Sequence, residues 1–311
     1  MLSSRLARET MAVSEREQEL GLIEGTPDEE GFAEVPGGCV WWRRVGRGPK
    51  TPLLLLHGGP GAGHNYLLPF LALSRDRSVI FYDQLGCGKS ESPAEEALYT
   101  IQRAVDEVDA VRAALGLDRI VLFGNSWGSM LAVEYMCQGR GKGVEKLILS
   151  GALASIPQTV AGMRRWIAAM PGGDRLVALE AAGETDTAEY AELTQRFYDR
   201  HVCRVQPAPP EVAQSLAVAA DSIAYRVMNG PNEFTIVGVI KDWDRRGDLH
   251  RITVPTYITM GEFDEVDLEC HRTLEAGIKG SIFEIFPGGS HMTMNEDPVG
   301  YVAAVGRFID G

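Results

Sequence analysis

Long apolar runs are missing from this chain, and it contains no stretch of about 18 apolar residues that could span a membrane. The first twenty residues, MLSSRLARETMAVSEREQEL, also lack the apolar centre of a secretory signal peptide. Positive charge is scarce, because 30 lysines and arginines stand against 43 aspartates and glutamates, which gives a net charge of −13. Such an acidic chain repels nucleic acids and anionic membrane surfaces, so neither is a predicted partner.

Cysteine is too sparse and too scattered to organise the fold. The cysteines are odd in number and form no CxxC pair; they are Cys39, Cys87, Cys137, Cys203 and Cys270. This pattern excludes the disulfide framework of small secreted domains and offers no zinc site. Together with the missing signal peptide, it predicts a reduced cytoplasmic protein without a bound metal.

Two glycine-rich segments look like nucleotide-binding loops but fail in detail. GPGAGH at 59–64 lacks the last glycine of the GxGxxG dinucleotide fingerprint. GCGKS at 86–90 resembles the end of a phosphate-binding P-loop, but Asp83 occupies the position of its first glycine. We therefore expect no nucleotide cofactor.

The chain does contain an alternation of short apolar runs and amphipathic stretches. Apolar runs of strand length lie at 53–57, 78–83, 119–123 and 146–151, and 101–116 has helical spacing and ends in glycine. Runs that are apolar throughout indicate strands covered on both faces, as in parallel sheets. The order of these segments predicts a doubly wound α/β sheet.

The pattern changes between 155 and 248, where nearly every segment has helical spacing. From 256 onward, segments typical of strands and helices alternate again. The simplest interpretation is one α/β core, 31–154 and 249–311, interrupted by a helical cap at 155–248. Residues 1–30 are polar with at most a weak helical pattern, and they predict a loose N-terminal arm.

The segment LFGNSWGSML (122–131) carries the strongest local signal, because it places Ser126 between Gly124 and Gly128 directly after an apolar strand. A strand, the pattern GxSxG and a helix together form the nucleophile elbow, a sharp turn that raises a serine hydroxyl above the sheet. Glycine on both sides removes Cβ atoms that would collide with the neighbouring strand and helix. Serine reacts only with a base and a group that orients this base, so Ser126 predicts a catalytic triad.

The other triad members are expected later in the chain, since α/β hydrolases have the order serine, acid, histidine. His291 lies in FPGGSHMTM, the loop after the last expected strand, and is the predicted base. The acid should follow the preceding strand, where TYITMGEFD ends at Asp264. Glu262 and Asp267 are the alternative acids.

Acyl transfer also needs backbone donors for the oxyanion of the tetrahedral intermediate. HGGPGAGHNY (57–66) follows the strand LLLL, where this fold supplies one such amide, and Gly59 is the predicted donor. The amide of Trp127, the residue after the nucleophile, is the predicted second donor. His57 begins the same loop, and we expect it to fix the backbone by hydrogen bonds rather than to act as a base.

Longer stretches resemble the proline iminopeptidase family of serine aminopeptidases, most closely its tricorn-interacting aminopeptidase branch. The resemblance rests on HGGPGAGHNYL, FYDQLGCGKS, GNSWGSMLAVEY, YRVMNGPNEFTIVGVIKDWD, GEFDEV and GGSHMTMNEDP. It runs from about Val40 to Asp310, and NGPNEF and GEFDEV are its most specific parts. It implies an α/β-hydrolase fold with a helical cap, and hydrolysis of the amide after a free N-terminal residue without a metal or organic cofactor.

The resemblance also implies that Glu233, in GPNEF, and Glu265, in GEFDEV, hold the free ammonium group of the substrate. A charged anchor at a fixed distance from the serine lets an exopeptidase count one residue. Two carboxylates in a closed cleft repel each other unless a cation lies between them. Without the resemblance, a turn-capping Glu233 and a solvated Glu265 are equally good interpretations.

The expected substrate is therefore a small peptide or an aminoacyl amide with a free amino terminus. The leaving amine stays open, since it can be a peptide or a non-peptide biosynthetic intermediate. A general esterase or acyl hydrolase on the same triad is the other alternative. Trp127 stands where relatives often have tyrosine or glutamine, so a preference for proline does not follow, and the oligomeric state stays undetermined.

Overall fold

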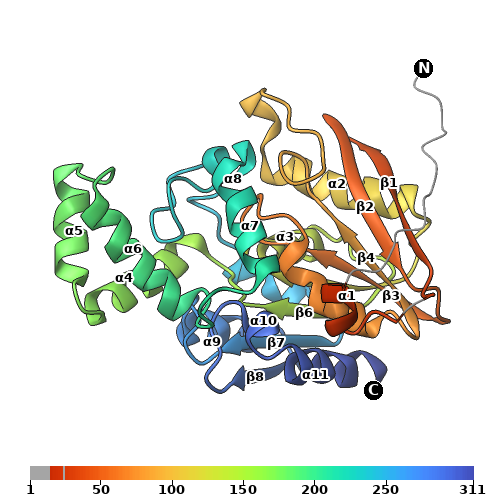
Figure 1. Ribbon diagram of the computed structural model, residues 1–311. Helices are drawn as coiled ribbons and strands as arrows, with labels where there is room; N and C mark the ends of the chain where they lie inside the picture. The colour runs from red at the N-terminus through yellow and green to blue at the C-terminus, as the bar shows by residue number, and fades with distance from the viewer. Residues whose placement is uncertain (1–14, 24) are drawn as a thin grey trace.

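A computed structural model describes residues 15–23 and 25–311, which form an eight-stranded sheet between layers of helices (Figure 1). The strands are β1 (Asp28–Val35), β2 (Gly38–Val45), β3 (Lys50–Leu56), β4 (Arg77–Tyr82), β5 (Ile120–Asn125), β6 (Val144–Ser150), β7 (Thr256–Gly261) and β8 (Ile282–Phe286). Their order in the sheet is β1-β2-β4-β3-β5-β6-β7-β8. Among these strands, β2 runs antiparallel to both of its neighbours, β1 and β4, and all other neighbouring pairs are parallel. This is the mostly parallel, doubly wound sheet that the apolar runs predict.

The central strands are covered on both faces, which explains why their sequences are apolar throughout. Leu54 of β3 packs on the face covered by α2 (Ile101–Ala114) and α3 (Trp127–Cys137), together with α9 (Leu268–Gly277). Its neighbour Leu55 points to the other face, towards η1 (Asn65–Leu73) and α11 (Pro298–Asp310). Both leucines are inaccessible to solvent. The carboxyl ends of these strands lead into the loops that carry the predicted site residues.

The chain leaves the sheet between β6 and β7, in a segment that the structure describes without a gap. It forms the helices α4 (Ile156–Ala169), α5 (Gly173–Ala182), α6 (Ala188–His201), α7 (Pro210–Asp221) and α8 (Ile223–Met228). The first three have a small apolar core of their own and project to one side of the molecule (Figure 1). Helix α7 packs instead on η1 of the sheet domain. We call α4–α8 the cap helices. They lie in the segment 155–248 that the sequence predicts to be a cap. The domain boundaries at 155 and 248 stay a prediction.

The described part of the N-terminal segment packs onto the rest of the chain, so the prediction of a loose arm is wrong for it. Helix α1 (Glu15–Glu19) is followed by Leu20 and Leu22, whose side chains are buried. Arg16 binds the carboxylate of Glu211 on α7 through Nε at 3.1 Å and Nη2 at 2.6 Å. The segment looks unattached in the sequence because its polar residues find their partners far along the chain. Residues 1–14 of the predicted arm lie outside the described residues.

The structure also describes the cysteines, the apolar character of the helices and the grouping of metal-ligating side chains. The five cysteines are free thiols, and four of them are buried. Within residues 15–23 and 25–311, no helix has the length and apolar character that a membrane crossing requires. The same residues contain no group of three or more histidine, cysteine, aspartate or glutamate side chains placed to hold a metal ion.

Candidate active site

Ser126 lies at the turn between β5 and α3 in a backbone conformation that side chains rarely adopt. Its φ is 55° and its ψ is −124°, and no other non-glycine residue in the described part of the chain has a positive φ. A Cβ on Gly124 would lie 2.2 Å from the carbonyl oxygen of Gly128, and one on Gly128 would lie 2.1 Å from that of Leu56. Close backbone contacts therefore require both glycines, as the sequence predicts.

His291 and Asp264 come from the loops after β8 and β7 and form a buried pair. Nδ1 of His291 lies 2.7 Å from Oδ1 of Asp264, which also accepts a hydrogen bond from the amide of Val266 at 3.0 Å. Among the described residues, Nε2 of His291 has no hydrogen-bond partner, and the ring lines a cavity together with Ser126. A neutral imidazole held in this way at Nδ1 presents the lone pair of Nε2 to that cavity.

The two alternative acids have other contacts. Oε2 of Glu262 accepts a hydrogen bond from the amide of Gly288 at 2.9 Å. Asp267 caps the N-terminus of α9, where its carboxylate accepts from the amide of Cys270 at 3.1 Å. Neither contact involves His291, so Asp264 is the acid that the structure brings to the histidine.

The predicted oxyanion donors line a cavity together with the serine. Gly59 and Trp127 line one cavity with Ser126, and their amides donate to no other residue in the described part of the chain. The amide of Gly58, by contrast, donates to the hydroxyl of Tyr66 at 2.6 Å. The amides of Gly59 and Trp127 are therefore available to a substrate oxygen in this cavity.

Glu233 and Glu265 line the same two cavities as Ser126. Glu265 is buried; its Oε1 lies 3.5 Å from Nε2 of His291, and its Oε2 has no hydrogen-bond partner among the described residues. The half-buried Glu233 accepts a hydrogen bond from the hydroxyl of Tyr225 at 2.8 Å. A buried carboxylate oxygen without a donor is a group that a cationic ligand would satisfy.

The charges in these cavities shift one another's pKa values. Burial raises the pKa of Glu265 well above its ordinary value; the charge of His291 opposes this, and that of Glu233 adds to it. Burial also raises the pKa of Glu233, against the hydrogen bond from Tyr225. For His291, burial lowers the pKa, but the negative charges of Asp264 and Glu265 outweigh it and raise the pKa to about 10. His291 therefore carries a proton at neutral pH, and a cation that enters the cluster favours its release.

Two small adjoining cavities surround Ser126. The first, which we call the apolar cavity, holds about 20 Å³ and is lined mainly by apolar side chains, among them Trp127, Met130, Leu153, Ile156 and Met163. The second, the histidine cavity, holds about 30 Å³ and is lined among others by Tyr66, Leu216, His291 and Met292. Each has room for little more than a water molecule in this conformation.

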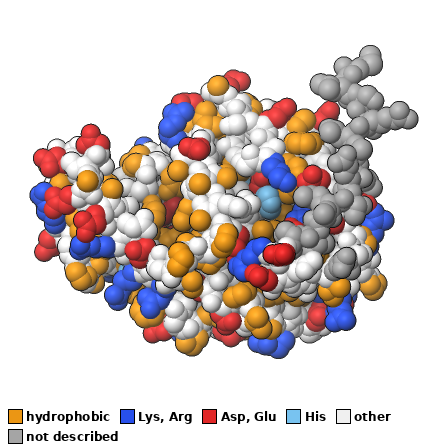
Figure 2. Space-filling view, in the orientation of Figure 1, with side chains coloured by type: hydrophobic (Ala, Val, Ile, Leu, Met, Phe, Trp, Pro, Cys, Tyr) orange, Lys and Arg blue, Asp and Glu red, His pale blue; other side chains and the backbone are white. Residues whose placement is uncertain are grey.

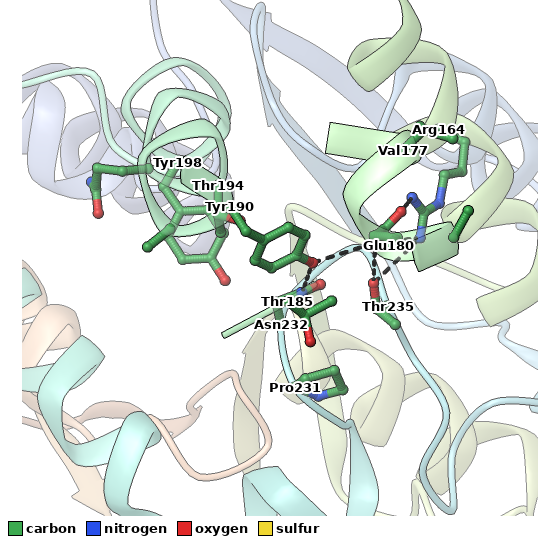
Figure 3. A pocket seen from close by; sticks show the side chains of 13 residues that line it. Arg164, Val177, Glu180, Thr185, Tyr190, Thr194, Tyr198, Pro231, Asn232 and Thr235 are labelled. Carbon is green, nitrogen blue, oxygen red and sulfur yellow. Dashed lines mark hydrogen bonds and ion pairs between the residues drawn. The ribbon is translucent and has the colours of Figure 1, made fainter. Parts of the chain in front are cut away.

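A larger cavity of about 820 Å³ lies within the cap helices, away from the serine. Its polar groups bind one another: Glu180 accepts from the hydroxyls of Tyr190 at 3.4 Å and Thr235 at 3.0 Å (Figure 3). Tyr198 lines this cavity, and its hydroxyl accepts from the amide of Glu233 at 3.4 Å. The larger cavity thus lies next to the loop of Glu233, and none of the predicted site residues lines it. On the face shown in Figure 2, apolar side chains gather in the hollow beside the projecting cap helices.

Three tyrosines that organise the site have no signal in the local sequence. The hydroxyl of Tyr66 donates to Oδ1 of Asn125 at 2.9 Å while accepting from the oxyanion loop. Tyr198 and Tyr225, from α6 and α8, both bind Glu233. Their partners lie on other segments of the chain, so only the folded structure brings them to the site.

The sheet, the strained serine and the His291–Asp264 pair define an α/β hydrolase, and residues 51–298 match the family model described as the α/β hydrolase fold. The proline iminopeptidase of Saccharolobus solfataricus is 39% identical over 288 residues, covering 91% of this chain and 92% of that protein. Among solved structures, a proline iminopeptidase of Mycobacterium smegmatis has a TM-score of 0.85 at 34% identity, over 91% of this chain and 98% of that one. VinJ has a TM-score of 0.85 at 33% identity, over 90% and 98%. The chain belongs to the proline iminopeptidase family.

Proposed function

We propose that this protein is a serine aminopeptidase that removes one unblocked N-terminal residue from a peptide or an aminoacyl amide. The observation that carries the proposal is that Glu233 and Glu265 line the cavities of Ser126 beside the His291–Asp264 pair. An ammonium group between the two glutamates would satisfy the unpartnered oxygen of Glu265 and offset the repulsion between the carboxylates. An anchor for the amino group next to the serine leaves room for a single residue before the scissile bond.

The reaction follows from the atoms that surround the serine. Oγ of Ser126 attacks the substrate carbonyl while Nε2 of His291 accepts the hydroxyl proton, and Asp264 holds the ring at Nδ1. The amides of Gly59 and Trp127 donate to the oxyanion of the tetrahedral intermediate. The imidazolium then protonates the leaving amine, and water hydrolyses the acyl-enzyme by the same route.

The apolar cavity supports an uncharged side chain on the residue that is removed. Apart from Glu233 and Glu265, to which we assign the amino group, its lining is mainly apolar, with side chains such as those of Trp127, Met130 and Ile156, which offer no partner for a second charge. Proline fits this description, and several relatives of this chain bear the name proline iminopeptidase. Proline, alanine, leucine and phenylalanine are therefore the first residues to compare.

A panel of aminoacyl-naphthylamides tests the proposal, with Pro, Ala, Leu and Phe each prepared with a free and with an N-acetylated amine. We expect the free-amine compounds to be hydrolysed and their acetylated forms to react about 100-fold more slowly or worse, because they leave buried carboxylates without a cation. Equal hydrolysis of both forms would contradict the exopeptidase assignment. Fast hydrolysis of p-nitrophenyl esters with none of the amides would favour the alternative of a general esterase.

The pH dependence tests the charge arrangement separately. His291 acts as a base only when neutral, and the carboxylates around it raise its pKa to about 10. The neutral form increases as the pH rises through this pKa, so hydrolysis of an ester without an amine should keep rising above pH 7. Glu265→Gln removes one negative charge and should move this rise about one to three pH units lower. The measurement is kcat/KM for p-nitrophenyl acetate from pH 5 to 10.

The control for this profile is Glu192→Gln, which changes an exposed glutamate of α6 that pairs with Arg196. Its pH profile should coincide with that of the wild type. If Glu265→Gln leaves the profile where it is, the charge of Glu265 does not act on the base.

A further inference from the structure

The direction of the Gly59 amide depends on the carbonyl group before it. In a planar trans peptide the C=O and the following N–H point in opposite directions, so whatever holds the Gly58 oxygen also aims the Gly59 N–H. This oxygen lies 2.9 Å from Nδ1 of His57 and accepts from the amide of Ala62 at 3.2 Å. The side chain of His57 therefore bears on the predicted oxyanion donor without touching the substrate.

The protonation of His57 follows from its second ring nitrogen. The backbone amide of Gln84 donates to Nε2 of His57 at 2.9 Å, and a backbone N–H cannot accept. Nε2 is thus the acceptor, and the proton of the neutral ring lies on Nδ1, where it donates to the Gly58 oxygen. Burial lowers the pKa of His57 and keeps the ring neutral.

The side chain of Gln84 connects the two halves of the predicted oxyanion site. Its Nε2 donates to the carbonyl oxygen of His57 at 2.9 Å, and its Oε1 accepts from Nε1 of Trp127 at 2.8 Å. Gln84 is buried two residues after the end of β4, and both ends of its amide are used inside the protein. One side chain thereby ties the loop of Gly59 to the residue that carries the second donor.

We propose that His57 and Gln84 are positioning residues of the oxyanion site: the backbone amide of Gln84 selects the tautomer of His57, the side chain of Gln84 ties the His57 loop to Trp127, and His57 aims the Gly59 amide at the developing oxyanion. This inference rests on the proposed function, because it assigns a role in stabilising the same tetrahedral intermediate. It adds two residues to the reaction that contact neither the substrate nor the His291–Asp264 pair.

Two substitutions of His57 distinguish this positioning role from simple packing. In His57→Asn, the side-chain nitrogen occupies the place of Nδ1 and can still donate to the Gly58 oxygen. In His57→Gln, the amide reaches the place of Nε2, which keeps a partner for Gln84 but leaves no donor for the Gly58 oxygen. We expect His57→Gln to lower kcat by about 100-fold, the usual cost of a lost oxyanion donor, with KM little changed. His57→Asn should retain most of kcat.

The inhibition constants of two compounds distinguish a lost oxyanion donor from a general structural defect. An aminoacyl boronic acid with a free amine forms a tetrahedral adduct on the serine, whereas pyrrolidine offers the amine without an oxygen for the oxyanion site. The inhibition constant of the boronic acid should rise in His57→Gln in proportion to the loss of kcat/KM, and that of pyrrolidine should stay constant. Gln84→Met should likewise raise the inhibition constant of the boronic acid and leave that of pyrrolidine constant.

Cys87→Ala is the matched control for packing: its buried thiol lies 3.5 Å from Nε2 of His57 and donates to the carbonyl oxygen of Gln84 at 3.2 Å, but it contacts neither the Gly58 oxygen nor Trp127. It should leave kcat and both inhibition constants near those of the wild type. Equal losses of kcat in His57→Asn and His57→Gln, or an unchanged boronic acid constant in His57→Gln, would overturn the proposal. If the proposed function fails, the wild type itself does not hydrolyse free-amine amides. The ratio of kcat between His57→Asn and His57→Gln can still be measured on any ester or amide that the serine hydrolyses, so the two failures are distinguishable.

Discussion

Ser126→Ala should lower kcat by about 10⁴- to 10⁶-fold, the range seen when a triad nucleophile is removed. The reason is that Ser126 is the residue placed by the strained turn into the cavities shared with His291, Gly59 and Trp127. His291→Ala should cost nearly as much, and the double variant should lose little more, because triad members act as a unit. The measurement is hydrolysis of the best naphthylamide of the panel.

The control is Ser281→Ala, which changes a serine in the turn before β8, far along the chain from the elbow. It should keep wild-type kcat. Circular dichroism and thermal unfolding of Ser126→Ala should match the wild type, since only one hydroxyl oxygen is removed. Activity within tenfold of the wild type in a well-folded Ser126→Ala would mean that another group is the nucleophile.

Replacing Glu265 or Glu233 by glutamine should lower kcat/KM for free-amine amides by about 100- to 1,000-fold. Each change keeps the shape of the side chain and removes the charge that pairs with the substrate ammonium; breaking a buried ion pair costs about 3–5 kcal/mol. The larger loss is expected for Glu265, which is fully buried and has an oxygen without a donor. The acetylated amides should be affected little.

The decisive quantity for these variants is the ratio of kcat/KM for a free-amine amide to that for its acetylated form. The ratio cancels any change in the titration of His291, which both substrates share. It should collapse in Glu265→Gln and Glu233→Gln and stay constant in Glu192→Gln, a change on the exposed face of α6. Equal losses on both substrates would show that the glutamates serve the fold and not the amino group.

Much of the candidate site could be predicted because its signals are local. The elbow is a strand, a turn and a helix in direct succession, and the steric need for Gly124 and Gly128 can be inferred from the turn itself. His291 and Asp264 follow from the order of strands, since parallel strands bring their carboxyl-end loops to one edge of the sheet. These predictions need no knowledge of contacts between distant segments.

The N-terminal segment and the edges of the sheet were harder to predict. Strand β1 reads DEEGFAEV, in which charged residues interrupt the apolar pattern, and its ladder forms only against β2. At the other edge, SIFEIF predicts a strand. In the structure this strand, β8, pairs only with β7 in the described sheet, and its Ile282 is 56% exposed. Periodicity indicates a strand but does not indicate its position in the sheet.

Side-chain networks between segments have no sequence signal at all. Gln84 contacts His57 and Trp127, which lie 27 and 43 positions away. Tyr198 reaches Glu233 across 35 positions. Buried polar groups need partners, so the sequence predicts that such residues are satisfied somewhere, but the identity of each partner depends on tertiary packing.

Labelling with a fluorophosphonate tests most directly whether one activated serine lies in a cavity that recognises a free amine. The rate of modification is measured alone, with prolinol and with N-acetylprolinol, and the adduct is located by peptide mass spectrometry. A single adduct on Ser126, formed more slowly with prolinol but not with its acetylated form, is the expected result. An adduct on another residue, no adduct, or equal protection by both compounds would contradict the account.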